Sequence, residues 1–272
     1  MAIIRKPAVA GMFYPQRKDE LKGLISLLFS KVNTGITKYK ARALVSPHAG
    51  YIYSGLTAAY GFDQIAATPF KKVIILSPSH REYFGGVCVY SGDGYSTPLG
   101  DIETDHELSD ALCTPDKRIF RGEYGHGPEH AIEVQLPFLQ YIWGDFKIAA
   151  VVMGEQSRRN IDALAENLAD VLTDDTFVIA SSDLSHFYSH QIADSLDSLI
   201  EKHINAFDCT SLQKDLDARR TEACGGGLIT SMMKAYGKKD ISKAKVLYRN
   251  DSSDTSGDES EVVGYLSAVI YN

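Results

Sequence analysis

Polar side chains follow three apolar segments of the chain, at the point where each segment ends. The segments read RALVSPH, KVIILSPSH and FVIASSDLSH, and they end at His48, His80 and His186, with Asp183 inside the third. Proline cannot donate a hydrogen bond to a strand ladder, so it marks where the first two strands end. The carboxyl ends of strands in an open α/β sheet form its ligand-binding edge. Because imidazole is the commonest metal ligand and titrates near neutral pH, the pattern predicts a metal site or an acid–base site. The alternative for each histidine alone is a hydrogen bond within its own turn.

A cysteine could complete this cluster. Cys224 lies in the sequence EACGGG, just before a segment with helical spacing of apolar residues, Leu228–Tyr236. The dipole of a helix favours a thiolate at its N-terminus, and the thiolate is the form that binds metal. The alternative is a small buried side chain beside the turn that begins the helix. Cys88, Cys113 and Cys209 form no C-x-x-C pair, which argues against a zinc ribbon or a disulfide scaffold.

A second histidine motif, HGPEH, begins at His126 and ends at His130. It matches the H-x-x-E-H pattern of inverted zinc peptidases, which requires both imidazoles on one helical face. Pro128 favours the first position of a helix, so we expect a helix to begin near it and His126 to lie outside that helix. His130 and Glu133 then share a face, where they would support the metal ligands or contact the substrate.

The elements that must position these residues follow from apolar periodicity. β-branched segments alternate with amphipathic segments, which is typical of an α/β fold with a mixed, mostly parallel sheet flanked by helices. Strands are expected at 43–46, 73–77, 87–90, 148–152, 177–180, 246–248 and 262–270, and helices over 21–28, 161–172 and 192–200. The last two strands would form an antiparallel hairpin at one edge. No break divides residues 1–272, so we expect one domain.

Three other polar features are expected to be structural. Thr104 and Glu107 have the spacing of a capping box, which predicts a helix start. His203 follows Leu199 and Ile200 on an apolar face, where we expect it to be packed. The acidic segment 250–260 lacks the glycine of a calcium-binding loop, so we expect a solvated loop there.

Composition limits the classes of partner. The chain has 272 residues, a net charge of −7, 44% hydrophobic and 23% charged residues. It has no basic stripe for nucleic acid, no apolar segment of membrane-spanning length and no signal peptide pattern, so we expect a cytoplasmic protein. The phosphate-binding glycine motifs and the G-x-S-x-G motif are absent as well.

Seven sequence motifs, in order along almost the whole chain, resemble the Memo family, whose prokaryotic members are known as protein B of the AmmeMemoRadiSam system. The motifs are AGMFYP at 10–15, SPHAGYIYSG at 46–55, SPSH at 77–80, EHAIEVQLPF at 129–138, SSDLSH at 181–186, CGG at 224–226 and VVGY at 262–265.

The resemblance implies a fold similar to that of the LigB-type class III extradiol dioxygenases, which use non-haem Fe(II). It implies that His48, His80 and Cys224 bind the metal, that Asp183 lines the pocket and that His186 acts as the catalytic base. The dioxygenases have a glutamate as their third ligand, whereas Cys224 takes that place here. A thiolate is a softer ligand and favours Fe(II), Cu(I) or Zn(II).

These observations lead us to expect a metal-dependent redox enzyme, dioxygenase-like, that acts on a small molecule with Fe(II) as the favoured cofactor. One alternative is a binding protein with a vestigial pocket, whose partners would be other AmmeMemoRadiSam proteins such as a radical-SAM enzyme. Animal members of the family are linked to phosphotyrosine signalling, but the expected pocket residues have no cluster of Arg or Lys beside them. A zinc hydrolase is the third hypothesis.

Overall fold

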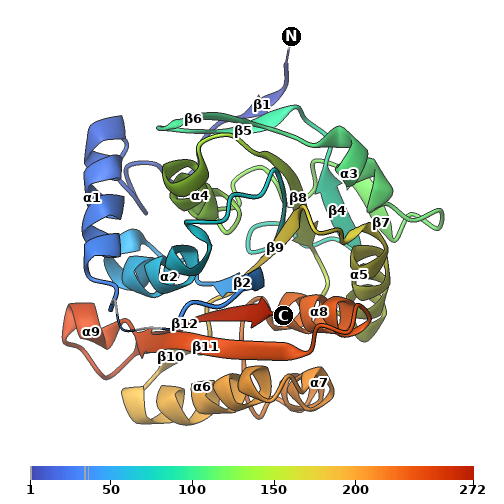
Figure 1. Ribbon diagram of the computed structural model, residues 1–272. Helices are drawn as coiled ribbons and strands as arrows, with labels where there is room; N and C mark the ends of the chain where they lie inside the picture. The colour runs from blue at the N-terminus through green and yellow to red at the C-terminus, as the bar shows by residue number, and fades with distance from the viewer. Residues whose placement is uncertain (1, 34, 36) are drawn as a thin grey trace.

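A mixed β-sheet runs through the centre of the protein, as Figure 1 shows for the computed structural model, which describes residues 2–33, 35 and 37–272. Nine strands form this sheet within the described residues. In order across the sheet they are β10 (His186–Tyr188), β12 (Val262–Tyr271), β2 (Ala41–Ser46), β9 (Thr176–Ser181), β3 (Lys72–Pro78), β8 (Lys147–Met153), β4 (Val87–Tyr90) and β7 (Ile119–Gly122), with β11 (Lys243–Asp251) also paired to β12.

Parallel pairing is confined to the centre of the sheet and to one end. Strands β2, β9, β3 and β8 are parallel neighbours, and so are β4 and β7. β12 runs antiparallel to β2, and β4 runs antiparallel to β8. The predicted α/β class with a mixed sheet is confirmed, and so is the antiparallel hairpin, formed by β11 and β12.

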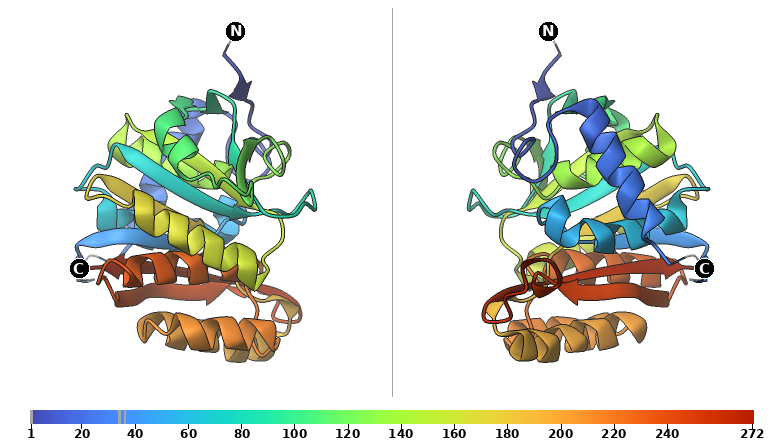
Figure 2. Two further views of the ribbon diagram at one scale, coloured as in Figure 1. Left: turned by 90° about the vertical axis from the view of Figure 1, so that its right-hand side faces the viewer. Right: turned by 90° about the vertical axis from the view of Figure 1, so that its left-hand side faces the viewer.

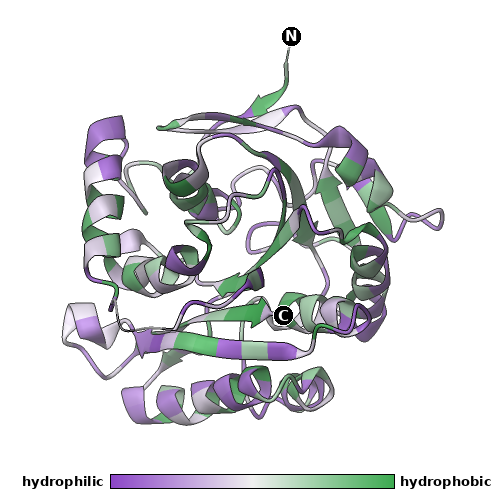
Figure 3. Cartoon of the chain, in the orientation of Figure 1, coloured by the Kyte–Doolittle hydropathy of each residue, from purple (hydrophilic) through white to green (hydrophobic). Residues whose placement is uncertain are grey.

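Helices cover both faces of the sheet. Figure 2 shows the molecule from two opposite sides. One face carries α1 (Lys18–Ser30), α2 (Tyr51–Ile65) and α4 (Leu136–Trp143), and the other carries α5 (Arg158–Val171), α6 (His190–Asn205), α7 (Cys209–Asp217) and α8 (Gly226–Gly237). Successive residues of β3 point to opposite faces, so Ile75 packs in the first core and Ile74 in the second. The central strands are correspondingly the most hydrophobic part of the chain in Figure 3.

A small second sheet lies outside the predicted pattern. It consists of β1 (Ile4–Arg5), β5 (Gly94–Thr97) and β6 (Gly100–Glu103). The next element, α3 (His106–Ala111), begins where the capping pattern predicted a helix start, but its cap is Asp105. The Asp105 carboxylate accepts the Leu108 N–H at 3.0 Å, one residue later than a Thr104 cap would place the helix.

The helix predicted near Pro128 begins later than expected. Residues 126–132 are irregular, and helical structure starts with the 3-10 turn η1 (Glu133–Gln135), which leads into α4. The Glu129 carboxylate accepts the backbone N–H groups of His130 and Ala131, at 2.9 and 3.0 Å. These bonds hold the segment in a turn, and the prediction from Pro128 alone was wrong. No helix within the described residues is both long and apolar enough to span a membrane.

Candidate metal centre

Two of the three predicted strand-end histidines and the cysteine meet at the carboxyl edge of the sheet, whereas His186 lies outside this group. His48 follows β2, His80 follows β3 and Cys224 precedes α8. One ligand atom from each of the three lies within 4.8 Å of the other two. The His48 and His80 rings are 5.0 Å apart between centroids, at an interplanar angle of 75°. The fold therefore brings together residues that are up to 176 positions apart in the chain.

The His48 ring is held in one orientation and one tautomer. Its Nδ1 lies 2.8 Å from the Ser181 hydroxyl oxygen, and that hydroxyl donates to the Ala131 carbonyl at 2.8 Å. Because the hydroxyl has only one proton, His48 Nδ1–H must be the donor in the first bond. The Nε2 lone pair then faces the Cys224 sulfur, 3.2 Å away. Burial lowers the pKa of His48, and the neighbouring imidazoles lower it further, so the ring is neutral.

The His80 ring is held in the same tautomer by a carboxylate. Its Nδ1 lies 2.9 Å from Glu129 Oε1, while its backbone N–H donates to Oε2 at 2.6 Å. Burial alone would raise the pKa of Glu129, but the hydrogen bonds and charge of His80 lower it to about 2. The ionised Glu129 holds a proton on Nδ1 of His80, so in the neutral form of the ring the lone pair lies on Nε2. Metal-bound histidines are typically oriented by carboxylates in this way.

Cys224 is partly buried and lies against Asp183. Its sulfur accepts the Asp183 backbone N–H at 3.2 Å. Burial raises the pKa of the thiol above its usual value, and the Asp183 charge raises it further. In the protein alone, this burial favours the neutral thiol, against the thiolate that the helix N-terminus was expected to favour. A metal ion would reverse this balance, since a coordinating thiol is deprotonated outright.

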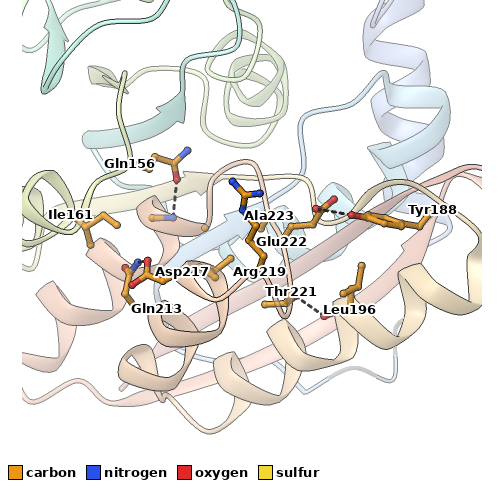
Figure 4. Close-up of a pocket in the computed structure, with 13 residues that line it drawn as sticks. Gln156, Ile161, Tyr188, Leu196, Gln213, Asp217, Arg219, Thr221, Glu222 and Ala223 are labelled. Carbon is orange, nitrogen blue, oxygen red and sulfur yellow. Dashed lines mark hydrogen bonds between the residues drawn. The ribbon is translucent and has the colours of Figure 1, made fainter.

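The loop of Cys224 is fastened by Gln156, which sequence reasoning missed. Figure 4 shows Gln156 at the edge of a cavity behind this loop, with its hydrogen bond drawn dashed. Its Nε2 donates to the Cys224 carbonyl at 2.6 Å, and its Oε1 accepts the Gly227 N–H at 2.8 Å. A Cβ atom at Gly225 would overlap the Ser181 carbonyl oxygen, so glycine is required there for the loop to approach β9.

A cavity of about 510 Å³ adjoins the cluster, and Asp183, His130 and His186 line it. Asp183 accepts the His48 backbone N–H at 2.7 Å, and burial raises its pKa to about 7. His130 packs beside His80, with ring centroids 4.9 Å apart, and burial lowers its pKa to about 4. His186 donates its backbone N–H to Glu222 at 2.9 Å, and burial lowers the pKa of its ring.

Comparisons with known proteins place the chain in a family. The family described as Memo-like protein matches residues 5–269. A MEMO1 family protein of Thermoplasma acidophilum is 37% identical over 267 residues, which is 97% of this chain and 98% of that protein. A MEMO1 family protein of Methanosarcina mazei is 36% identical over 271 residues, covering 98% of this chain and 99% of that one. The chain belongs to the Memo-like family.

A solved structure supports the fold of this Memo-like chain. The crystal structure of the uncharacterized protein JW3007 from Escherichia coli K12 superposes with a TM-score of 0.56, over 84% of this chain and 98% of that one. Its sequence identity is 13%, so the likeness concerns the fold alone.

Glu133 of the Memo-like chain lies beneath the N-terminal segment. It is fully buried, and its carboxylate accepts hydrogen bonds from Arg5 at 2.6 Å, Tyr14 at 2.5 Å and the backbone of Ala8 at 2.7 Å. These contacts fix the segment that places Phe13 against His130. The Phe13 and His130 rings are 4.9 Å apart in an edge-to-face arrangement. Glu133 thus supports a wall of the cavity from behind, whereas His130 lines the cavity itself.

The remaining histidine predictions concern packing. His126 is buried away from the cluster, where its ring bonds to the Tyr95 hydroxyl at 2.6 Å and the Cys88 carbonyl at 3.2 Å. It therefore cannot pair with His130 in a zinc-peptidase motif. His203 is buried as predicted and pairs with Asp215 at 2.7 Å.

Proposed function

We propose that this Memo-like protein is a metal-dependent oxidoreductase of the dioxygenase-like kind that acts on a small molecule. His48, His80 and Cys224 would bind one metal ion, with Fe(II) favoured and Cu(I) or Zn(II) as alternatives. The observation that carries the proposal is the shared tautomer of the two imidazoles. Ser181 and Glu129 each accept an Nδ1 proton, so both rings, when neutral, would bind a metal through Nε2. His48 Nε2 lies 3.2 Å from the Cys224 sulfur, and one ligand atom of His80 lies within 4.8 Å of that sulfur.

The spacing of the ligand atoms suits a metal ion. A tetrahedral ion with its usual bonds to imidazole nitrogen and thiolate sulfur would separate the two atoms by ~3.6 Å. His48 Nε2 and Cys224 Sγ are 3.2 Å apart. A small outward movement of the thiol would therefore admit an ion. Two nitrogens and one sulfur form a borderline-soft donor set, which suits Fe(II), Cu(I) and Zn(II) better than Mg²⁺ or Ca²⁺.

The residues around the cluster have distinct roles in this proposal. When bound, the metal would supply redox or Lewis-acid chemistry at positions that the protein leaves free. Asp183 fixes the His48 loop through its bond to the backbone and borders the cavity. His186 lines the same cavity with a neutral ring that can accept a proton from a substrate hydroxyl. The cavity is large enough for a small aromatic molecule.

Anaerobic titration with Fe(II), Cu(I) and Zn(II) tests the ligand set. We expect one ion per chain, a charge-transfer band from thiolate to metal with Fe(II), and a loss of affinity in Cys224→Ala. Cys209→Ala is the matched control, because Cys209 is also a free, partly buried thiol but lies outside the cluster. Equal stoichiometry and affinity in wild type and Cys224→Ala would remove Cys224 from the site.

A partner-binding role is the second candidate, and exposed apolar side chains beside the cavity favour it. Met12 is 72% exposed and Ile52 is 66% exposed, and both line the cavity. Other AmmeMemoRadiSam proteins, such as a radical-SAM enzyme, are the partners that the family suggests. His186→Ala separates the two functions. An enzyme should lose turnover and keep its metal, whereas a binding protein should retain partner affinity.

A further inference from the structure

The cavity beside the cluster of His48, His80 and Cys224 is lined by aromatic rings and by carboxylates. We infer that it binds a small aromatic molecule carrying a protonated amine, with the ring toward the cluster and the amine at the mouth. This inference rests on the proposed function, because it names the substrate class of the same site.

The walls of the cavity suit an aromatic ring. Its volume of about 510 Å³ is in the range of small-molecule sites. The larger apolar and aromatic side chains of the lining are those of Met12, Phe13, Ile52, Tyr53, Val263 and Tyr265. Aromatic faces also attract cations, so these side chains favour an ammonium group over a carboxylate.

The charged lining residues are acidic. Asp258 and Glu261 are exposed at the mouth, and Asp183 lies at the buried end. Within the described part of the chain, the lining contains neither lysine nor arginine. A carboxylate or phosphate ligand would meet like charge here without the basic group that such ligands need. A protonated amine at the mouth would be attracted by both exposed carboxylates.

One polar group in the wall has no hydrogen-bond partner among the described residues. Tyr265 lines the cavity and is 2% exposed as a residue, but its hydroxyl oxygen is not among the fully buried unpaired atoms, so this oxygen is accessible from the cavity. A hydroxyl group on the ligand ring would supply a partner, which places the polar substituent of the ring at the buried end.

The acidic mouth is held in place by its own hydrogen bonds. The segment 250–260, expected to be a solvated loop, contains the short helix α9 (Ser253–Ser256). Thr255 donates its hydroxyl to the Ile52 carbonyl at 3.0 Å, which ties this segment to α2. Asp258 accepts the Ser260 N–H at 2.9 Å and the Ser260 hydroxyl at 2.6 Å, and these two bonds lower the pKa of Asp258. The negative charge is therefore present and positioned before a ligand arrives.

Three phenols of nearly equal size test the inference. Tyramine carries a cation, 4-ethylphenol is neutral and 4-hydroxyphenylacetate carries an anion. Dissociation constants would be measured by saturation-transfer NMR on protein as purified and after metal removal. We expect tyramine to bind about tenfold more tightly than 4-hydroxyphenylacetate, with 4-ethylphenol between them.

Two variants test which residues cause the preference for the cationic phenol. Asp258→Asn with Glu261→Gln should bring the three affinities to within about twofold of one another, because it removes the charge at the mouth. The control, Asp101→Asn with Glu107→Gln, removes the same charge from exposed residues outside the cavity and should leave the order unchanged. Tyr265→Phe should weaken all three phenols equally without changing their order.

The inference is overturned if the anion binds as tightly as the cation, or if the cation preference survives in the Asp258→Asn, Glu261→Gln protein. Binding of none of the three phenols to either form of the protein overturns it as well. Failure of the proposed function looks different. Metal titration would then show no ion at the cluster, while the metal-free protein could still prefer tyramine.

Discussion

Replacing Glu133 by glutamine should destabilise the protein by about 3–5 kcal/mol, the usual cost of leaving one partner of a buried ion pair alone. Glu133 is completely buried, and its ion pair with Arg5 has an N···O distance of 2.6 Å. Its two oxygens also accept the N–H groups of Ala8 and Val9 and the Tyr14 hydroxyl. Glutamine keeps the shape but has one acceptor oxygen, so an NH₂ group would face donors.

This loss is large compared with the total stability of ordinary proteins, about 5–15 kcal/mol. Urea unfolding of wild type and Glu133→Gln measures it directly, and hydrogen exchange at the Ala8 and Val9 amides reports the local effect. Glu103→Gln is the matched control, since Glu103 pairs with Lys147 at 2.8 Å but is 73% exposed. The control should cost less than about 1 kcal/mol.

A loss below about 1 kcal/mol in Glu133→Gln would refute the assignment of a buried, charge-paired anchor. So would unchanged exchange at Ala8 and Val9, because both amides donate to the Glu133 carboxylate. An intermediate loss with fast exchange at these two amides would still support the anchor, since the segment would then open locally before the protein unfolds.

Three further predictions concern the site and the pH dependence of stability. Glu129→Gln should weaken metal binding about 10- to 100-fold in the anaerobic titration, because a neutral amide no longer fixes the His80 tautomer. Burial raises the pKa of Asp197 to about 6 from 3.8, so its contribution to stability is full below pH 3.8 and is lost as pH rises through 6. The unfolding free energy of Asp197→Asn, measured with urea and taken relative to wild type, should therefore rise by up to ~3 kcal/mol from pH 4 to pH 8. An equal difference between the two proteins at both pH values would contradict this. Burial lowers the pKa of His126 to about 3 from 6.5, so wild-type stability should fall as pH drops below 6.5. By pH 3 this costs up to ~4–5 kcal/mol, and His126→Asn should flatten the profile of unfolding free energy against pH.

The strand-end histidines could be predicted because their positions follow from local rules. A proline after an apolar segment ends a strand, and parallel strands end at one edge, so His48 and His80 were expected at the same edge of the sheet. For Cys224 the residues alone offered a candidate, and the family resemblance implied that it is a metal ligand, because its segment has no strand to set its place. The state of its thiol could not be predicted from the helix that follows, since burial against Asp183 depends on the tertiary fold.

The residues that sequence reasoning missed act through long-range contacts. Glu129 was part of a recognised motif, but its partner, His80, lies 49 positions away. Gln156 has no motif at all, and it reaches the Cys224 loop across 68 positions. The acidic segment 250–260 has the composition of a surface loop, and only the packing of α9 beside α2 brings it to the cavity. Such roles become visible when the three-dimensional neighbours are known.

Arg5 connects the two halves of the site. Its guanidinium pairs with the Glu133 carboxylate, which holds the N-terminal wall of the cavity, and it also donates to the Glu129 backbone carbonyl. Glu129 in turn fixes the tautomer of His80 through its side chain. One buried cation therefore supports both the aromatic wall that would receive a substrate and a ligand of the proposed metal. Because Arg5 is only 8% exposed, losing the Glu133 carboxylate would leave its charge poorly compensated, and the wall and the ligand would shift together.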